Sequence, residues 1–143
     1  MRPTYKTDMD INDIRKLLLK KKEELNELYN SGLNKFSFPG YNKGSIRTCE
    51  AQVLYSIIQE KKYSSILDIG TGPGFSAVYL ARALKDAGIN GFVDTINIED
   101  APKSTFDLFK VSDYINIHKG DSLDIVPKLD NHDLILIDSS HTY

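Results

Sequence analysis

The chain has 143 residues, a length typical of one domain, and 41% of them are hydrophobic, which is enough for a packed core. Its net charge of −2 creates no basic field, so broad binding to nucleic acid is not expected. No apolar run approaches the roughly 20 residues of a membrane span, no secretion signal is recognisable at the N-terminus, and Cys49 is the only cysteine, so we expect a cytoplasmic protein without a membrane partner.

Residues 1–45 are predicted to form an N-terminal helix followed by a lid-like loop. The helix covers residues 10–30, because its apolar side chains recur on one stripe, and Asp10 is its predicted N-cap. The loop that follows is rich in Gly, Asn and Ser and carries three aromatic residues, Phe36, Phe38 and Tyr41. These rings either cover a ligand or dock the loop on the core, and both interpretations stay open. A second helix is predicted over residues 48–61.

From residue 64 onward, strands and helices alternate. Strands are predicted over residues 65–69, 92–98, 114–120 and 133–138, and helices over residues 75–88, 101–112 and, interrupted by Pro127, 121–129. Asp100 is a plausible cap of the second of these helices. The alternation predicts an α/β fold with a doubly wound parallel sheet over residues 46–143, covered by helices on both faces. The unbroken "LILI" of the last strand favours burial on both sides.

A glycine-rich loop follows the first of these strands, where parallel α/β sheets bind their ligands. Its residues are Gly70, Thr71, Gly72, Pro73 and Gly74. The G-x-G-x-G spacing differs from the G-x-G-x-x-G of dinucleotide-binding loops. Asp68, two residues before the first glycine, would repel a pyrophosphate and attract an ammonium group. A nucleoside that carries both an amine and a carboxylate therefore fits this loop better than NAD does.

This stretch, "LDIGTGPG", resembles the first motif, D/E-x-G-x-G-x-G, of the class I S-adenosylmethionine-dependent methyltransferases. The resemblance implies a Rossmann-like fold with S-adenosylmethionine (SAM) as cofactor. It also implies that Asp68 holds the methionine amine. The backbone of residues 70–74, including Gly70, Thr71, Gly72 and Gly74, would then line the methionine and the ribose.

Two further matches concern the ends of the second and third strands. The family usually carries a ribose-binding acid at the first position, where this chain has Asn97, with Glu99 two residues on. Either residue could bind the ribose, or both could simply end a strand. After the third strand, the resemblance implies that Asp121 accepts a hydrogen bond from the adenine amine and that Ser122 lies beside the ring. Asp121 could equally be a helix N-cap.

The segment "HDLILIDSSHTY" resembles the fourth-strand motif F-D-x-I-F-I-D-G-D-H-x-Y of small-molecule O-methyltransferases. In metal-dependent relatives the acid at Asp138 binds a divalent cation such as Mg²⁺, but Ser139 and Ser140 replace the usual Gly and Asp here. Asp138 and His141 are therefore the candidate catalytic residues: a cation at Asp138 or His141 as general base could help an acceptor hydroxyl to lose its proton. His118 and His132 are interpreted as structural.

The expected function is SAM-dependent methyl transfer to the hydroxyl of a small-molecule acceptor. Two alternatives stay open: a truncated, non-catalytic SAM-binding remnant or interaction module, and an NAD(P)-binding module. The family's strand order, 3-2-1-4-5-7-6, would leave strand four at an exposed edge of an incomplete domain. An apolar edge invites pairing, so a homodimer through strand four is predicted.

Overall fold

Four parallel strands form the centre of the protein. In this computed structural model, residues 8–39 and 46–138 are described. The strands are β1 (Ser65–Ile69), β2 (Phe92–Asn97), β3 (Ile115–Lys119) and β4 (Leu134–Ile137), in the order β3-β2-β1-β4. Every neighbouring pair is parallel, and Asp68 of β1 lies opposite Thr95 of β2. The predicted α/β fold with a parallel, Rossmann-like sheet is confirmed.

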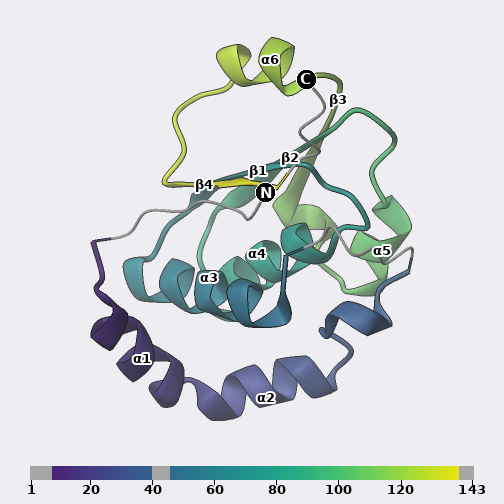
Figure 1. The fold of residues 1–143 in the computed structure, drawn as a ribbon. Coiled ribbons are helices and arrows are strands. Elements are labelled where there is room, and N and C mark those ends of the chain that lie inside the picture. The colour runs from purple at the N-terminus through teal and green to yellow at the C-terminus, as the bar shows by residue number, and fades with distance from the viewer. Residues whose placement is uncertain (1–7, 40–45, 139–143) are drawn as a thin grey trace.

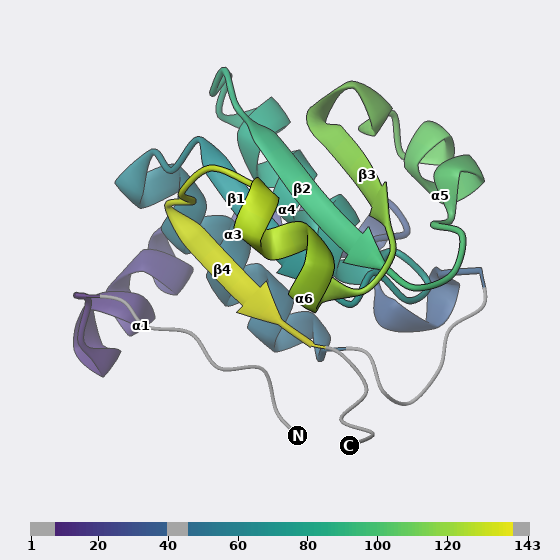
Figure 2. The same cartoon turned by 90° about the horizontal axis from the view of Figure 1, so that it is seen from above.

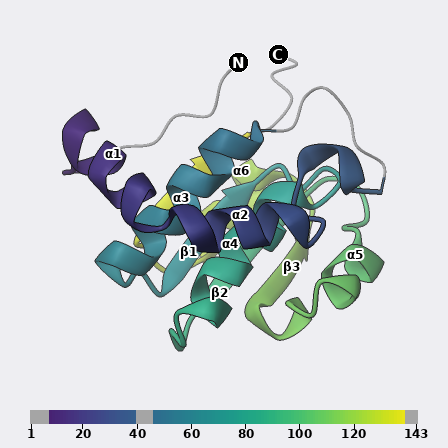
Figure 3. The same ribbon diagram turned by 90° about the horizontal axis from the view of Figure 1, so that it is seen from below.

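Helices lie on both faces of this sheet. On one face pack α3 (Thr48–Lys61) and α4 (Phe75–Asp86), and beyond them, farther from the sheet, lie α1 (Ile11–Lys20) and α2 (Lys22–Asn30) (Figures 1 and 3). The short helix α6 (Ser122–Ile125) and the 3-10 turn η3 (Val126–Lys128) cover part of the other face (Figure 2). Helix α5 (Lys103–Leu108) and the turn η2 (Ser112–Tyr114) lie beside β3, and η1 (Lys35–Ser37) follows α2. None of these helices is long and apolar enough to cross a membrane, within the ranges that the structure describes.

The N-terminal helix predicted over residues 10–30 is divided in two at Lys21, which has φ −99° and ψ 8°. Both parts of this N-terminal segment are bound to α3. Lys61 of α3 forms an ion pair with Asp8, just before α1, at 2.8 Å. In α2, the carboxylate of Glu24 accepts a hydrogen bond from the Tyr55 hydroxyl of α3 at 2.6 Å. The break at Lys21 lets the chain bend around the α3–α4 layer.

The main apolar core lies between the sheet and the α3–α4 layer, and the N-terminal segment contributes to it. Leu33 and Phe38 are buried with Ile66 and Phe75 in one cluster. The ring of Phe38 stacks on Phe109 at 4.8 Å and meets Phe75 edge-on at 4.9 Å. Phe38 therefore docks the loop on the core, as one of the two interpretations proposed. Phe36 is 81% exposed, and Tyr41 lies outside the described residues.

Strand β4 differs from the expectation that both of its sides are buried. Leu134 and Leu136 are buried against the α3–α4 layer, whereas Ile135 and Ile137 are 44% and 42% exposed. Successive side chains of a strand point to opposite faces, and the described helices leave the second face partly open at β4. Within the described sheet β4 is an edge strand that pairs with β1 only. Dimerisation through this edge stays a prediction.

The region around α5 corrects a second expectation. The helix covers only residues 103–108, and Pro102, not Asp100, occupies its N-cap position. The Asp100 carboxylate instead forms an ion pair with Lys119 of β3 at 2.8 Å. Pro102 lacks an N–H and has φ −78° and ψ 68°, so regular helix begins only after it.

Candidate functional site

The carboxyl ends of the four parallel strands lie along one edge of the sheet, and the predicted site residues follow them. Asp68 and the glycine loop come at the end of β1, and Asn97 ends β2. Asp121 follows β3, and Asp138 follows β4. The fold thus brings together segments that are up to 70 residues apart in the sequence.

Asp68 is fully buried, and its carboxylate is bound by two neutral hydroxyl groups. Thr95 of β2 donates to one carboxylate oxygen at 2.9 Å, and Ser76 of α4 donates to the other at 3.2 Å. The hydroxyl of Thr71 lies 2.6 Å from that of Thr95 and extends the chain into the glycine loop. Burial raises the pKa of Asp68 to about 7, although both hydrogen bonds act to lower it. The charge of Asp138 adds to the rise.

The glycines of the loop serve two different purposes. All three have positive φ, at 97° for Gly70, 51° for Gly72 and 89° for Gly74. A Cβ on Gly74 would lie 2.8 Å from Pro102 and 2.9 Å from Phe106, so this glycine is required for packing against α5. A Cβ on Gly72 would meet nothing within 4 Å. Gly72 therefore leaves bare backbone beside open space, where a ligand could approach.

At the end of β2, the backbone of Asn97 is engaged while its side chain has no hydrogen bond among the described residues. Its carbonyl accepts the N–H of Gly120 at 2.8 Å, which ties β2 to the loop after β3. Glu99 is exposed, and Ile98 between them is 71% exposed. Within residues 8–39 and 46–138, no side-chain partner of Asn97 or Glu99 is present that would prevent ligand binding.

Asp121 caps α6, which was one of the two interpretations of this residue. Its carboxylate accepts the N–H of Leu123 at 2.9 Å. Ser122 is the first residue of the helix and is half-buried. Leu123 is 82% exposed. Ile98 and Leu123 thus present exposed apolar side chains close after the ends of neighbouring strands, a feature that the sequence reading missed.

Asp138 lies where the end of β4 meets the N-terminal part of the chain. It is half-buried, and burial raises its pKa above the ordinary value. The N–H of Ile46 and the charge of Lys35 oppose this rise, and the charge of Glu50 adds to it. His141, Ser139 and Ser140 lie outside the described residues. No group of three or more His, Cys, Asp or Glu side chains suited to a metal ion is present in ranges 8–39 and 46–138.

A second buried carboxylate, Asp94, lies in β2, and the sequence analysis did not identify it as a candidate. His132 donates to one of its oxygens at 2.8 Å, and His118 of β3 donates to the other at 2.9 Å. Asn116 adds a third bond at 3.2 Å. Burial acts to raise the pKa of Asp94, but these bonds outweigh it, so the pKa lies below its ordinary value. Both histidines are thus bound within the fold.

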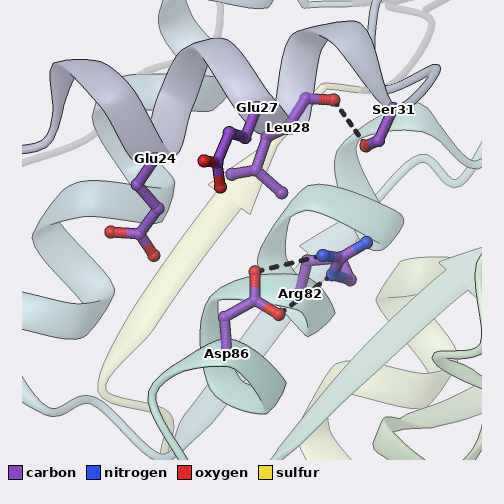
Figure 4. A pocket seen from close by; sticks show the side chains of 6 residues that line it. All are labelled: Glu24, Glu27, Leu28, Ser31, Arg82 and Asp86. Atoms are coloured by element: carbon purple, nitrogen blue, oxygen red, sulfur yellow. Dashed lines mark hydrogen bonds and ion pairs between the residues drawn. The ribbon is translucent and has the colours of Figure 1, made fainter.

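A depression of about 410 Å³ lies between α2 and α4, shown in Figure 4. The side chains of Glu24, Glu27 and Leu28 line it from α2, and those of Arg82 and Asp86 line it from α4. Arg82 donates to Asp86 through Nε at 3.2 Å and Nη2 at 3.3 Å. None of the predicted site residues belongs to this depression.

The residues after the start of β1 match a known family model. The model described as "Methyltransferase domain" matches residues 67–143, which is more than half of the chain. The chain belongs to this methyltransferase family. A search of curated protein sequences gave no match.

Solved methyltransferase structures share the fold. The O-methyltransferase TomG from Streptomyces achromogenes, solved in complex with SAM, is 25% identical, with a TM-score of 0.56 over 87% of this chain and 49% of TomG. An O-methyltransferase from Bacillus cereus, solved with S-adenosylhomocysteine (SAH), is 22% identical, with a TM-score of 0.62 over 84% of this chain and 54% of its own. The SAH-bound methyltransferase PaMTH1 from Podospora anserina is 18% identical, with a TM-score of 0.59 over 95% of this chain and 52% of PaMTH1. The last two support the fold alone, and the chain spans about half the length of these proteins.

The hydroxyl groups that donate to Asp68 are the part of the candidate site that was not predicted from the sequence. Ser76 is eight residues from Asp68 in α4, and Thr95 is 27 residues away in β2. One signal was available: Thr95 lies two positions after Val93 in "VDTINI", so the two side chains share one face of the strand, and both are buried. Its partner, however, depends on the register between β1 and β2.

Proposed function

We propose that this methyltransferase-family chain binds SAM and serves in methyl transfer to a hydroxyl group of a small molecule. The observation that carries the proposal is the Asp68 carboxylate, buried without a cationic partner among the described residues, beside a loop whose backbone is open at Gly72. An ammonium group is the partner that such a carboxylate lacks. SAM has this group, and TomG, to which the chain is similar, was solved in complex with SAM.

The surrounding residues fit the remaining parts of the cofactor. Gly72 lets a methionine or ribose moiety approach the backbone closely. Asn97 or Glu99 would bind the ribose hydroxyls. The carboxylate of Asp121, which accepts the N–H of Leu123, would also accept a hydrogen bond from the adenine amine. Ser122 would lie beside the ring. The exposed side chains of Ile98 and Leu123 would contact its apolar faces.

SAM supplies a methyl group already activated on a sulfonium, so the protein must chiefly orient the acceptor and exclude water. The acceptor oxygen must also lose its proton. Asp138, half-buried at the neighbouring strand end and with a raised pKa, is a candidate to receive that proton, and His141 is another. The described residues do not offer a group of three ligands for a cation, and Asp138 stays the candidate ligand.

Calorimetry with SAH and NADH tests the cofactor. We expect SAH to bind and NADH not to bind, because a buried carboxylate before the loop would repel a pyrophosphate. Binding of NADH without binding of SAH would replace this proposal by the NAD(P)-binding alternative.

A second candidate function is SAM binding without turnover. Asn97 and Ser140 favour it, since both stand where the resembled methyltransferases carry acids. A methyl-transfer assay over catechols, phenols and sugars, with and without Mg²⁺, separates the two. Turnover by this chain would eliminate the non-catalytic alternative. SAH binding without turnover on any acceptor would favour it.

We also propose that the chain forms a homodimer through β4. Ile135 and Ile137 are more than 40% exposed on an edge strand, and neither Lys nor Pro interrupts it. Light scattering over a concentration series should show a mass that rises toward twice 16.1 kDa. The double variant Ile135→Lys/Ile137→Lys leaves the buried Leu136 in place and should stay monomeric. A parent chain that stays monomeric at high concentration would contradict this proposal.

A further inference from the structure

Among the described residues, the environment of Asp68 contains no compensating positive charge. Its two carboxylate oxygens are occupied by the hydroxyl groups of Thr95 and Ser76, and the side chain is 0% exposed. The charged side chain whose field acts on it is Asp138, from the end of β4, which is also acidic. Lys35 and Glu50, from η1 and α3, act on Asp138. A buried carboxylate in such surroundings favours its neutral, protonated form.

The hydroxyl groups work against this preference. A hydrogen bond donated to the charged form of a carboxylate stabilises that form. Thr95 has one proton to give, and it donates that proton to Asp68 at 2.9 Å. The hydroxyl of Thr71, 2.6 Å from Thr95, can then donate to the Thr95 oxygen, so that the chain runs from the glycine loop to the carboxylate.

We propose that Asp68 releases a proton when SAM binds, and that Thr95 and Ser76 are positioning residues that control how readily it does so. This inference rests on the proposed SAM binding. In the free protein, Asp68 exchanges between a neutral and a charged form near neutral pH. The ammonium group of the ligand pairs only with the charged form, so the proton leaves for solvent as the ion pair forms. The affinity for SAM therefore depends on pH through the free protein.

The direction of this dependence follows from linkage. The ligand binds the deprotonated carboxylate, so its affinity rises with pH until the carboxyl of the free protein is fully ionised. Because burial raises the pKa of Asp68 to about 7, the affinity keeps rising to about pH 8, and its increase between pH 5.5 and pH 7 amounts to roughly tenfold. The ligand's own amine stays charged over most of this range, since α-amino groups titrate near pH 8.

Calorimetry with SAH tests the proposal in the intact chain. SAH is titrated at pH 6.5 in two buffers with different enthalpies of ionisation, and the difference in heat gives the number of protons released. We expect the release of a large fraction of one proton per SAH bound, and a dissociation constant that falls roughly tenfold from pH 5.5 to pH 7.

The positioning role is tested with Thr95→Val, which keeps the shape of the side chain and removes the hydroxyl. The pH at which SAH affinity levels off should rise, and binding at pH 7 should weaken severalfold. Thr95→Ser should restore both values, because it keeps the donor. Thr105→Val is the matched control, because Thr105 is a buried threonine of α5 that makes no hydrogen bond to Asp68. The pH dependence of SAH affinity in this variant should match that of the parent.

The outcomes separate this inference from the proposed function. If the parent binds SAH with no proton release and with the same affinity at pH 5.5 and pH 7, the inference is wrong and the proposed function stands. If SAH does not bind at any pH, both are wrong. The proton count uses the parent chain, so it decides the question even if Thr95→Val fails to fold. An unchanged pH profile in a folded Thr95→Val variant would exclude the role of Thr95.

Discussion

Asp68 and Asp94 are both buried carboxylates in the central strands, and their surroundings are opposite. They lie on neighbouring strands but on opposite faces of the sheet, because Asp68 is in register with Thr95 and Asp94 with Leu67. Asp68 is bound by neutral hydroxyl groups, and its pKa is raised; Asp94 is bound by two imidazoles and an amide, and its pKa is lowered. Burial penalises the charge of both. At Asp94 the bonds from the two histidines and Asn116 outweigh this penalty, whereas at Asp68 the two hydroxyl groups do not, and the charge of Asp138 raises the pKa further.

This difference separates a structural carboxylate from one suited to a ligand. Asp94 has the partners it needs within the protein, and they join β2, β3 and the turn before β4. Asp68 has no cationic partner in the part of the chain that the structure describes, and it lies beside an open loop. We therefore expect substitution of Asp94 to affect mainly folding, and substitution of Asp68 to affect mainly binding. The following experiments test this contrast, from the largest expected effect to the smallest.

Asp94→Ala should lower the free energy of unfolding by about 3 kcal/mol, because it leaves His132 and His118 without their acceptor on the sheet. The side chain of His132 is only 4% exposed, so water cannot replace the lost bond easily. Urea denaturation at pH 7 measures the change. Asp113→Ala, at an exposed site with no hydrogen bond from its side chain among the described residues, should stay within about 0.5 kcal/mol of the parent. Equal values for the two variants would remove the structural role of Asp94.

Asp68→Asn should weaken SAH binding by about 1–3 kcal/mol, the contribution of a charge-assisted hydrogen bond. It should not destabilise the protein at pH 7.5, because it removes a buried charge that has no cationic partner. Calorimetry and urea denaturation of the same preparation measure the two effects. A variant that binds SAH like the parent but unfolds more easily would reverse the roles that we assign to the two carboxylates.

The sequence was sufficient for the fold, and it also indicated the acidic and glycine residues of the candidate site. The strand–helix alternation and the "LDIGTGPG" motif are local patterns, so Asp68 and the loop could be read directly. The hydrogen bonds of the two carboxylates could not be predicted from the sequence. Thr95 reaches Asp68 across 27 residues and His132 reaches Asp94 across 38, and both depend on strand register. The half-exposed face of β4 could not be predicted either, because a continuous apolar sequence such as "LILI" does not show whether the second face of the strand is covered.

The glycines of the loop allow the same contrast to be tested with one added methyl group. Gly74→Ala should destabilise the protein by about 2 kcal/mol, since its Cβ would lie 2.8 Å from Pro102 and 2.9 Å from Phe106 at φ 89°. Gly72→Ala has open space and φ 51°, so it should cost only about 1 kcal/mol of stability but reduce SAH affinity. Thermal unfolding and calorimetry measure the pair. Equal losses of SAH affinity in the two variants would indicate that Gly72 does not face the ligand.

The pH dependence of stability should differ in sign at the two carboxylates. The pKa of Asp94 is lowered on folding, so its contribution is present above pH 4 and is lost as the pH falls through its folded pKa. The pKa of Asp68 is raised to about 7, so between about pH 4 and pH 7 the folded protein binds more protons than the unfolded chain, and stability falls as the pH rises. One proton contributes at most about 1.4 kcal/mol per pH unit.

We expect the difference in unfolding free energy between Asp68→Asn and the parent to grow in favour of the variant from pH 4 to pH 7. The corresponding difference for Asp94→Asn should instead shrink as the pH falls below 4. Urea denaturation from pH 3 to pH 8 gives both curves, and subtraction of the parent's curve cancels the titration of groups that the variants share. If the Asp68→Asn difference were flat over this range, Asp68 would be ionised in the free protein as an ordinary carboxylate is, and the contrast with Asp94 would fail.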